Sequence, residues 1–369
     1  MKRVGSIVLI LILIGQINLK ADEGMWMLPD IEKLIMPDML ELGIQLTAED
    51  IYSINNSSIK DAIVIFGRGC TGEIVSDDGL LFTNHHCGFD EIQYHSSVDH
   101  DFLNDGFWAM SRDDELPNPD LEVRFLKRIE NITGRILEGV TDSLTEEGRR
   151  SKIREKIDSI KEERSDDGLE AIVKSFYAGN EYYLFEYEVF KDVRLVGAPP
   201  SSIGKFGYDT DNWEWPRHTG DFSIFRVYTA PDGSPAEYST DNIPLKPKYF
   251  LPVSLKGYEK GDLTFILGYP GGTDRYLCSY GILETMQVEN ANRIRIRGER
   301  LNILMRDMQA DPKVRIQYSN KYFRSSNYWK YSIGQNYRLR VLDVIDEKRQ
   351  EEMEFQDWWL TLCREIRVW

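Results

Sequence analysis

Thr83-Asn84-His85-His86-Cys87-Gly88 is the stretch that decides the fold, because it places a histidine directly before a cysteine at the end of an apolar run. Two apolar runs, residues 62–66 and 80–83, flank a turn rich in Asp and Gly at residues 76–79. Apolar runs separated by such a turn predict a β-hairpin. We therefore expect the second strand of this hairpin to deliver the histidine at its far end.

A cysteine next to the histidine allows a covalent tie. A disulfide from Cys87 back to Cys70 would hold the backbone that carries the imidazole, and closing a loop of this size is worth about 3 kcal/mol in the chain-entropy model. The layout is similar to that of chymotrypsin-like peptidases, in which a Thr-Ala-Ala-His-Cys stretch carries the general base. His86 stands next to the cysteine and is the expected base, whereas we expect His85 to be structural.

Composition narrows the classes of function. The 369 residues carry a net charge of −16, which would repel a phosphate backbone, so we expect no nucleic-acid partner. The 19 Tyr and 8 Trp argue against disorder, and the length allows two domains and a large core.

The amino terminus has the three regions of a secretory signal peptide. The basic pair Lys2-Arg3 precedes an apolar run at residues 4–14, and Ala21 offers a cleavage position. We expect residues 1–21 to be a signal peptide, the mature protein to be periplasmic or secreted, and no membrane association beyond this peptide. The run is short for a membrane span, although an uncleaved anchor is the alternative.

An exported protein meets an oxidising compartment, where disulfides persist. The pair Cys70 and Cys87 can then stay oxidised, whereas Cys278 and Cys363 have no obvious partners.

Asp221 stands at the start of a stretch that alternates as a strand, residues 221–228, directly after an aromatic loop at residues 209–220. A carboxylate at the start of a buried strand needs a partner, because an unpaired buried charge is costly. His86 is the natural one: Asp221 would accept a hydrogen bond from Nδ1 and hold the tautomer that a general base requires. An aspartate that only caps a turn is the alternative.

Other segments carry structural expectations. Residues 121–129 and 182–195 alternate as strands, and residues 263–267 predict a further strand. The charged segment 145–164 predicts an exposed helix, and residues 169–176 predict a second helix.

The last third of the chain has helical spacing at residues 282–308 and 341–358, which predicts a helical domain. The glycine-rich turn at residues 268–272 invites a phosphate-loop interpretation. We reject it, because no Lys-Ser or Lys-Thr follows and a lone glycine cluster is weak evidence.

The order of these features resembles the bacterial dipeptidyl-peptidase 7 and 11 family, periplasmic serine exopeptidases with a chymotrypsin-like double β-barrel interrupted by a helical domain. The matching stretches are residues 24–26, 69–72, 83–88, 92–96, 105–109, 197–212, 215–223 and 268–271. The resemblance implies a mainly β fold: an incomplete chymotrypsin-like (trypsin-like) double β-barrel with the start of an inserted α-helical domain. It implies a peptidase domain at residues 22–275 and a truncated helical domain at residues 276–369.

The resemblance also implies roles for individual residues. His86 matches the family's catalytic histidine and Asp221 its catalytic aspartate, while Asn212, Trp213 and Asn327 match residues that bind the free N-terminus of the substrate. An Asn carbonyl accepts an ammonium proton, and an indole face attracts a cation. The implied partners are oligopeptides with a free N-terminus and a second copy of the chain in a homodimer, and no cofactor is implied.

Alternative interpretations of these residues stay open. Trp213 could be an ordinary core aromatic residue, and Asn327 an ordinary helix residue. His95, His100 and His218 suggest a metal site with His86, but no ligand pair has helical or zinc-knuckle spacing, so we expect no metal.

The chain departs from the family in its nucleophile. No Gly-x-Ser-Gly sequence occurs, and Ser201, Ser202 and Ser279 lie in the wrong surroundings. In the family the serine follows the helical domain, and residues 359–369 do not resemble the family, which suggests a frameshift or premature stop. We expect a serine dipeptidyl aminopeptidase by descent that is inactive as this polypeptide. The alternative is a non-catalytic periplasmic peptide-binding protein that retains the amine-binding residues.

Overall fold

The computed structural model describes most of the chain, at residues 25–164, 169–208, 212–272, 274 and 276–366. The signal peptide predicted over residues 1–21 lies outside the described residues. The chain divides into two compact units, Met1–Tyr52 and Ser53–Trp369.

Short helices make up the described part of the first unit: η1 (Leu28–Asp30), α2 (Ile31–Leu34), α3 (Met36–Glu41) and α4 (Ala48–Ile51). The start of α4 is closed by a capping box. Thr47 Oγ1 accepts from the Asp50 amide at 3.1 Å, and Asp50 Oδ2 accepts from the Thr47 amide at 2.8 Å. This reciprocal pair satisfies backbone donors that a helix start leaves open.

The second unit contains an antiparallel sheet of eleven strands among the described residues, in the order β4-β9-β10-β3-β2-β1-β6-β8-β7, with β11 on β10 and β5 on β9. The strands are β1 (Ile63–Phe66), β2 (Cys70–Ile74), β3 (Leu80–Thr83), β4 (Phe107–Trp108), β5 (Leu116–Pro117), β6 (Val123–Asn131), β7 (Glu170–Phe176), β8 (Glu181–Phe190), β9 (Asp192–Ala198), β10 (Ser223–Thr229) and β11 (Ile243–Pro244). Within the described residues no pairing joins β7 to β4, so the strand order does not show the closed double barrel that was expected.

The predicted hairpin around residues 76–79 is present, but its first strand is not the one expected. Strand β2 lies between β1 and β3 and pairs with both, so the motif has three strands. The sequence of β2, Cys-Thr-Gly-Glu-Ile, has no apolar run, and its place is set by backbone hydrogen bonds to its neighbours. The strands predicted at residues 121–129 and 182–195 correspond to β6 and to β8 with β9.

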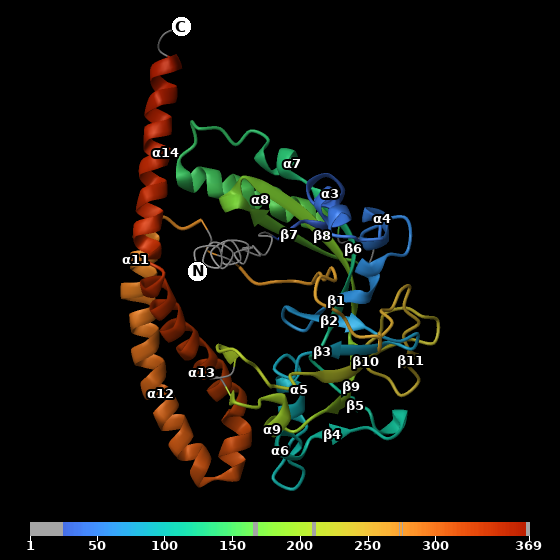
Figure 1. Cartoon of the computed structure of the whole chain (residues 1–369). Coiled ribbons are helices and arrows are strands. Elements are labelled where there is room, and N and C mark those ends of the chain that lie inside the picture. Colours follow the sequence, from blue (N-terminus) through green and yellow to red (C-terminus); the bar gives the residue numbers. More distant parts are fainter. Residues whose placement is uncertain (1–24, 165–168, 209–211, 273, 275, 367–369) are drawn as a thin grey trace, which may run out of the picture. The chain divides into compact units, whose positions relative to one another are not determined.

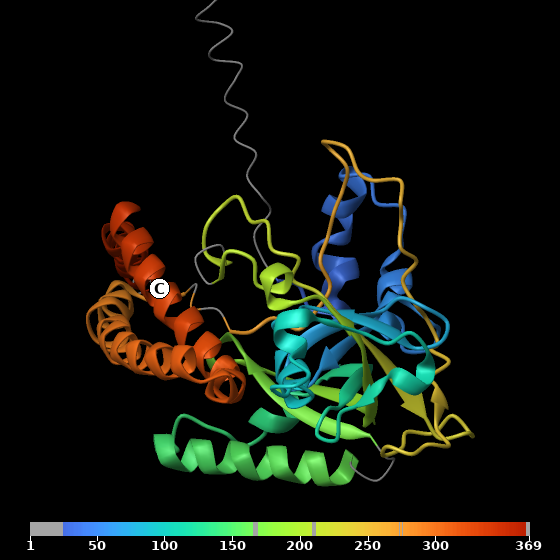
Figure 2. The same cartoon turned by 90° about the horizontal axis from the view of Figure 1, so that it is seen from below.

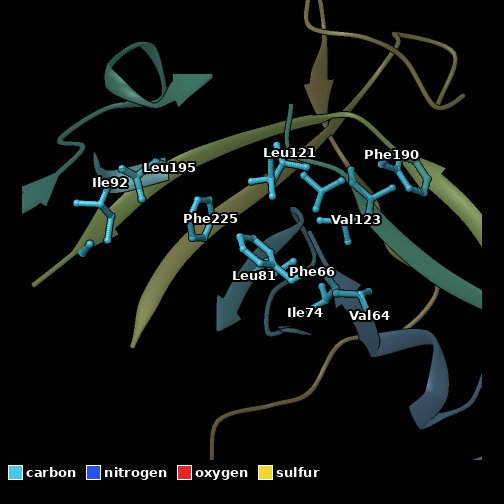
Figure 3. Close-up of a cluster of buried hydrophobic side chains, with 14 of the residues drawn as sticks. Val64, Phe66, Ile74, Leu81, Ile92, Leu121, Val123, Phe190, Leu195 and Phe225 are labelled. Atoms are coloured by element: carbon cyan, nitrogen blue, oxygen red, sulfur yellow. The ribbon is translucent and has the colours of Figure 1, made fainter. Parts of the chain in front are cut away.

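One hydrophobic cluster connects these strands (Figure 3). Alternate residues of β1, Val64 and Phe66, point into it together with Leu81 of β3 and Phe225 of β10. Helices α5 (Phe89–Tyr94) and α6 (Phe102–Asp105) were not predicted; Ile92 of α5 is fully buried in the same cluster. Burial on both sides of the turn at residues 84–88 therefore fixes the segment that carries the two histidines.

The helix predicted at residues 145–164 is confirmed as α8 (Glu146–Arg164), but the second helix at residues 169–176 is wrong. That segment forms strand β7, which pairs along its whole length with β8. Its β-branched residues Ile172 and Val173 suit a strand, and a partner strand decides the outcome. In both views α8 lies along β7 and β8 (Figures 1 and 2). Ile153 and Ile157 of α8 and Val173 of β7 pack against the same buried cluster.

The strand predicted at residues 263–267 is also wrong: no strand forms there in the described residues. A strand is completed by hydrogen bonds to a neighbour, and no described strand pairs with this segment. Ile266 is 95% exposed as a result. The glycine turn that follows is anchored, because the Tyr269 amide donates to Thr71 Oγ1 at 2.8 Å.

Helices fill the last third of the chain, as predicted, so the fold is an antiparallel sheet with a substantial helical part rather than mainly β. They are α11 (Ser279–Glu284), the π-helical turn η6 (Thr285–Glu289), α12 (Asn290–Ala310), α13 (Pro312–Val341) and α14 (Val344–Ile366). Helices α12 and α13 lie side by side, and Trp329 Nε1 donates to the Ile294 carbonyl oxygen at 3.0 Å (Figure 1). None of the helices in the described ranges combines the length and the hydrophobicity needed to cross a lipid bilayer.

Candidate active site

The sheet register places the turn at residues 84–88, the His86 turn, beside the start of β10. Thr83 is paired with Ser223, and Ser223 Oγ donates to the Asn84 carbonyl oxygen at 2.8 Å. Gly88 is required at the end of the turn, since a Cβ there would come within 2.6 Å of Ser223 Oγ. Asp221 lies two residues before Ser223, so this register brings the aspartate to the histidine.

A disulfide closes the other side of the turn. Cys70 of β2 is bonded to Cys87, with a Cα–Cα distance of 6.1 Å, so the expected bridge is present. Cys278 and Cys363 are free thiols. His86, directly before Cys87, is therefore held from two sides, by the bridge to β2 and by the pairing of β3 with β10.

His86 and Asp221 form the pair that the sequence predicted. His86 Nδ1 lies 2.7 Å from Asp221 Oδ2, and the His86 amide donates to Oδ1 at 3.0 Å. Asn84 Nδ2 donates to the Asp221 carbonyl oxygen at 3.2 Å, and an Arg217 guanidinium nitrogen lies 3.4 Å from Oδ2. The His86 side chain is 54% exposed and that of Asp221 only 12%. The imidazole thus has one edge held and the other open to solvent.

The charge of Asp221 follows from its surroundings. Burial raises the pKa of Asp221, but the hydrogen bonds and charge of His86, together with Arg217, outweigh it and hold the pKa below its usual value. An ionised carboxylate only accepts hydrogen bonds, so the proton of the neutral imidazole sits on Nδ1. Nε2 of His86 then carries the lone pair, as a general base requires.

His85 has the opposite environment. Its ring is fully buried, packs edge-on against Phe89 at 5.7 Å, and lies so close to Gly204 that a Cβ there would come within 2.3 Å. Neither ring nitrogen has a hydrogen bond of ordinary geometry, although the Pro199 carbonyl is near. Burial lowers the pKa of His85 to about 4. A neutral imidazole packed in this way agrees with the structural role expected for His85.

The three residues expected to bind an N-terminus also meet. Asn212 Nδ2 and Trp213 Nε1 donate to the same oxygen, Asn327 Oδ1, at 2.7 and 3.0 Å. The Trp213 ring packs 5.1 Å from that of Tyr331, one turn beyond Asn327 on α13. Because Asn327 Oδ1 already accepts two hydrogen bonds, Asn212 Oδ1 is the side-chain acceptor that this set can offer an ammonium group.

The histidines do not assemble a metal site among the described residues. One group of potential ligands lies close together there, Cys70, His86 and Cys87, with its atoms within 4.8 Å of one another. Both sulfurs belong to the disulfide, so neither is a thiolate that a metal needs. His95 Nε2 instead lies 3.1 Å from Asn118 Oδ1.

Two contributors were not predicted from the sequence. Arg217 is a partner of Asp221, and the only signal for it was a basic residue four positions before the aspartate. Gln93, in the stretch after the His86 turn, bonds to the backbone of α13. No local pattern predicts a contact between residues so far apart in sequence.

Similar chains are found by comparison with known proteins. A family model described as Peptidase S46 matches residues 21–366. A protein named "Dipeptidyl-peptidase 7" from Porphyromonas gingivalis is 50% identical over 342 residues, which cover 92% of this chain and 48% of that protein. One named "Asp/Glu-specific dipeptidyl-peptidase" from Flavobacterium psychrophilum is 48% identical over 334 residues, which cover 90% and 47%. The chain spans about half the length of these curated relatives.

Among solved structures, the crystal structure of Porphyromonas endodontalis DPP11 in complex with the dipeptide Arg-Asp superposes with a TM-score of 0.86 at 45% sequence identity. The match covers 92% of this chain and 49% of that one. The arrangement of sheet and helices described above is therefore a fold shared with that protein.

Proposed function

The chain belongs to the peptidase S46 family, and from this we propose that it carries the general-base half and the amine-binding part of a serine dipeptidyl-peptidase site, which releases dipeptides from the free N-terminus of oligopeptides. The observation that carries the proposal is the His86 Nδ1–Asp221 Oδ2 contact of 2.7 Å beside a half-exposed imidazole. We also propose that the sheet belongs to a chymotrypsin-like double barrel, which the fold shared with the DPP11 structure supports.

The geometry supports a separate role for each of the two residues, His86 and Asp221. Nε2 of His86 takes the proton of a serine hydroxyl as that oxygen attacks the peptide carbonyl, and later gives it to the leaving amine. Asp221 holds the imidazole in the required tautomer and stabilises the imidazolium that forms. The disulfide and the β3–β10 register keep the two side chains in place without reorganisation during the reaction.

The amine-binding residues account for release from the N-terminus. An ammonium group at Asn212 Oδ1 and the Trp213 ring fixes the end of the peptide, so the bond that reaches His86 lies a set number of residues away. The DPP11 structure that superposes on this chain contains a dipeptide, which supports a peptide ligand in this fold.

Cleavage also requires a nucleophilic serine at His86 Nε2, whereas the ring hydrogen bond of His86 seen among the described residues is made by Nδ1 to Asp221. We therefore propose that residues 22–369 alone do not turn over peptides. The test is an assay of this purified polypeptide on dipeptidyl chromogenic substrates. Release of chromophore that is lost in His86→Ala would overturn the proposed inactivity, and no release in either protein supports it.

A second candidate is a non-catalytic peptide-binding protein, favoured by the preassembled Asn212–Trp213–Asn327 set. Calorimetric titration with a dipeptide distinguishes it. Binding that disappears when the N-terminus is acetylated supports amine recognition, and no binding to the unmodified dipeptide removes this candidate.

We further propose export to the periplasm, which the Cys70–Cys87 bond supports because disulfides persist in oxidising compartments. The unfolded mature protein should then react with a thiol reagent at Cys278 and Cys363 alone before reduction. Reaction at Cys70 or Cys87 in protein isolated from the producing cells would contradict this. The homodimer is likewise a proposal that rests on the family, and sedimentation of the purified chain tests it.

A further inference from the structure

The helix that carries Asn327 is docked on the short helix that follows the His86 turn (Figure 1). Phe323 of α13 packs edge-on against Phe89 of α5 at 5.1 Å, and Arg324 pairs with Asp90 at 2.7 Å. The Arg315 guanidinium pairs with Asp101 beyond α5. The contact therefore joins the two halves of the proposed site, the general base and the amine-binding residues.

Gln93 makes the unusual bond in this contact. Its Oε1 accepts from the backbone amide of Asn320 at 2.9 Å, and its Nε2 donates to the backbone carbonyl of Gln317 at 3.4 Å. Asn320 lies inside α13, where backbone amides ordinarily serve only the helix itself. A side-chain amide that engages the backbone of a helix at two points holds that helix against sliding and rotation, which contacts between side chains alone do less well.

Few residues separate the Gln93 bond from each half of the proposed site, and they lie in helices or in the disulfide-tied turn. Asn327 follows Asn320 by seven residues, which is two helical turns, so both lie on one face about 10 Å apart along the axis. On the other side, Gln93 belongs to α5, which begins two residues after the disulfide-bonded Cys87. No loop intervenes between Gln93 and either functional residue except the disulfide-tied turn.

We propose that Gln93 is a positioning residue that holds Asn327 at a fixed distance from His86. This distance then sets the length of the released fragment at two residues from the free N-terminus. This inference rests on the proposed function, because it assigns the set of Asn212, Trp213 and Asn327 to the substrate amine and His86 to the scissile bond. Gln93 touches neither the substrate nor the reacting atoms; it acts through the placement of α13.

A simple estimate shows why such a bond matters. One peptide residue spans about 3.4 Å, and Asn327 lies about 10 Å beyond the Gln93 contact. A tilt of α13 by about 20° around that contact would displace Asn327 by one residue length. For cleavage after the second residue, the orientation of α13 must therefore vary by only a small fraction of this tilt. An exposed ion pair such as Arg324–Asp90 contributes little to holding the helix in place.

The first test needs no peptide. Gln93→Met keeps the length of the side chain and removes both hydrogen bonds, and Arg324→Gln is the matched control in the same contact. We expect the Asn320 amide to exchange with solvent at least 10-fold faster in Gln93→Met and within 2-fold of wild type in Arg324→Gln. Gln93→Glu keeps the accepting oxygen and should recover most of the protection. Equal exchange in Gln93→Met and the control would overturn the inference.

The second test asks whether the two halves are coupled. The dipeptide Arg-Asp, with its N-terminus free, is titrated into each protein, and the nuclear magnetic resonance signal of the His86 C2 proton is followed. In wild type and Arg324→Gln the signal should shift at saturation. In Gln93→Met binding should weaken at least 5-fold, and the shift should be lost even when saturation is reached.

The outcomes separate this inference from the function on which it rests. A His86 shift that persists in saturated Gln93→Met overturns the positioning role while leaving amine binding intact. No binding of Arg-Asp to the wild type overturns the amine-binding function instead, and the exchange measurement still decides whether Gln93 holds α13.

Discussion

The two halves of the proposed site are built in different ways. The His86–Asp221 half is held by a disulfide, by the pairing of β3 with β10 and by two hydrogen bonds from His86 to one carboxylate. The amine-binding half is held by two hydrogen bonds to one oxygen of Asn327, on a helix more than a hundred residues away in sequence. The first half is cross-linked by a disulfide and anchored in the sheet. The second half stays assembled only while α13 stays docked on α5.

This difference has a functional consequence. A general base must be in place before the transition state forms, so rigidity contributes directly to its action. A group that recognises the substrate end acts in binding rather than in the bond-breaking step, so non-covalent contacts of a docked helix can hold it. We expect substitutions in the first half to change the stability of the fold, and those in the second half to change mainly peptide binding.

The largest effect is expected from the covalent tie. Replacing both Cys70 and Cys87 by Ser removes a crosslink that spans 17 residues, and the free energy of unfolding should fall by about 3 kcal/mol. Urea unfolding followed by fluorescence measures the loss. Cys278→Ser, at an exposed free thiol, is the control and should change it by less than about 0.5 kcal/mol. A loss below 1 kcal/mol in the double variant would mean that the sheet alone fixes the turn.

The adjacent histidine gives the next largest effect, and it depends on pH. The pKa of His85 is about 4 in the folded protein and about 6.5 when unfolded. Below pH 6.5 the unfolded chain therefore binds a proton that the folded chain does not, and stability falls until the pH reaches about 4. Between pH 7 and pH 4.5 this group should cost roughly 2.5 kcal/mol.

His85→Phe keeps a flat ring beside Gly204 and removes the titration. The free energy of unfolding should then fall less steeply from pH 7 to pH 4.5 than in the wild type, by the amount given above. His218→Gln, at an exposed histidine, is the control for removing an imidazole elsewhere in the chain. Parallel slopes for His85→Phe and wild type would show that His85 is hydrated or paired, contrary to its burial.

In the amine-binding half, Asn327→Ala should cost only about 1 kcal/mol of stability, because the donors of Asn212 and Trp213 can turn to water. Binding of a dipeptide with a free N-terminus should weaken at least 5-fold. Asn327→Asp keeps the accepting oxygen and should stay within 0.5 kcal/mol in stability. A stability loss above 3 kcal/mol for Asn327→Ala would break the comparison, because the second half would then also be part of the core.

The sequence predicted the first half better than the second for a physical reason. Thr83 to Gly88 is a local pattern, and the need of Asp221 for a partner followed from the cost of a buried charge, so the pair could be expected without coordinates. Asn212, Trp213 and Asn327 were expected only through the family resemblance. Gln93 was not expected at all, since nothing in its neighbourhood shows that a helix from the last third of the chain will dock there.

The errors in the fold share a cause. Residues 169–176 and 263–267 both have apolar character that fits more than one structure, and a neighbouring strand decides which forms. The first segment has β8 beside it and becomes β7; the second has no described partner and forms no strand. The local sequence pattern makes a segment able to form a strand, whereas the pairing itself depends on residues that are distant in the sequence.

The smallest effect is expected at Arg217, and it tests how far the first half is over-determined. The guanidinium is 3.4 Å from Asp221 Oδ2 and its side chain is 39% exposed, so Arg217→Gln should cost only about 0.5 kcal/mol, as exposed ion pairs do. The pKa of Asp221 is lowered in the fold, so the contribution is present above its usual value near 4 and disappears as the pH falls through the lower folded value. The difference in the free energy of unfolding between the variant and wild type should be full at pH 7 and should decrease as the pH is lowered below about 4. A cost above 1.5 kcal/mol would mean that the carboxylate depends on Arg217 for its charge, whereas a small cost follows if His86 and Asn84 already satisfy it.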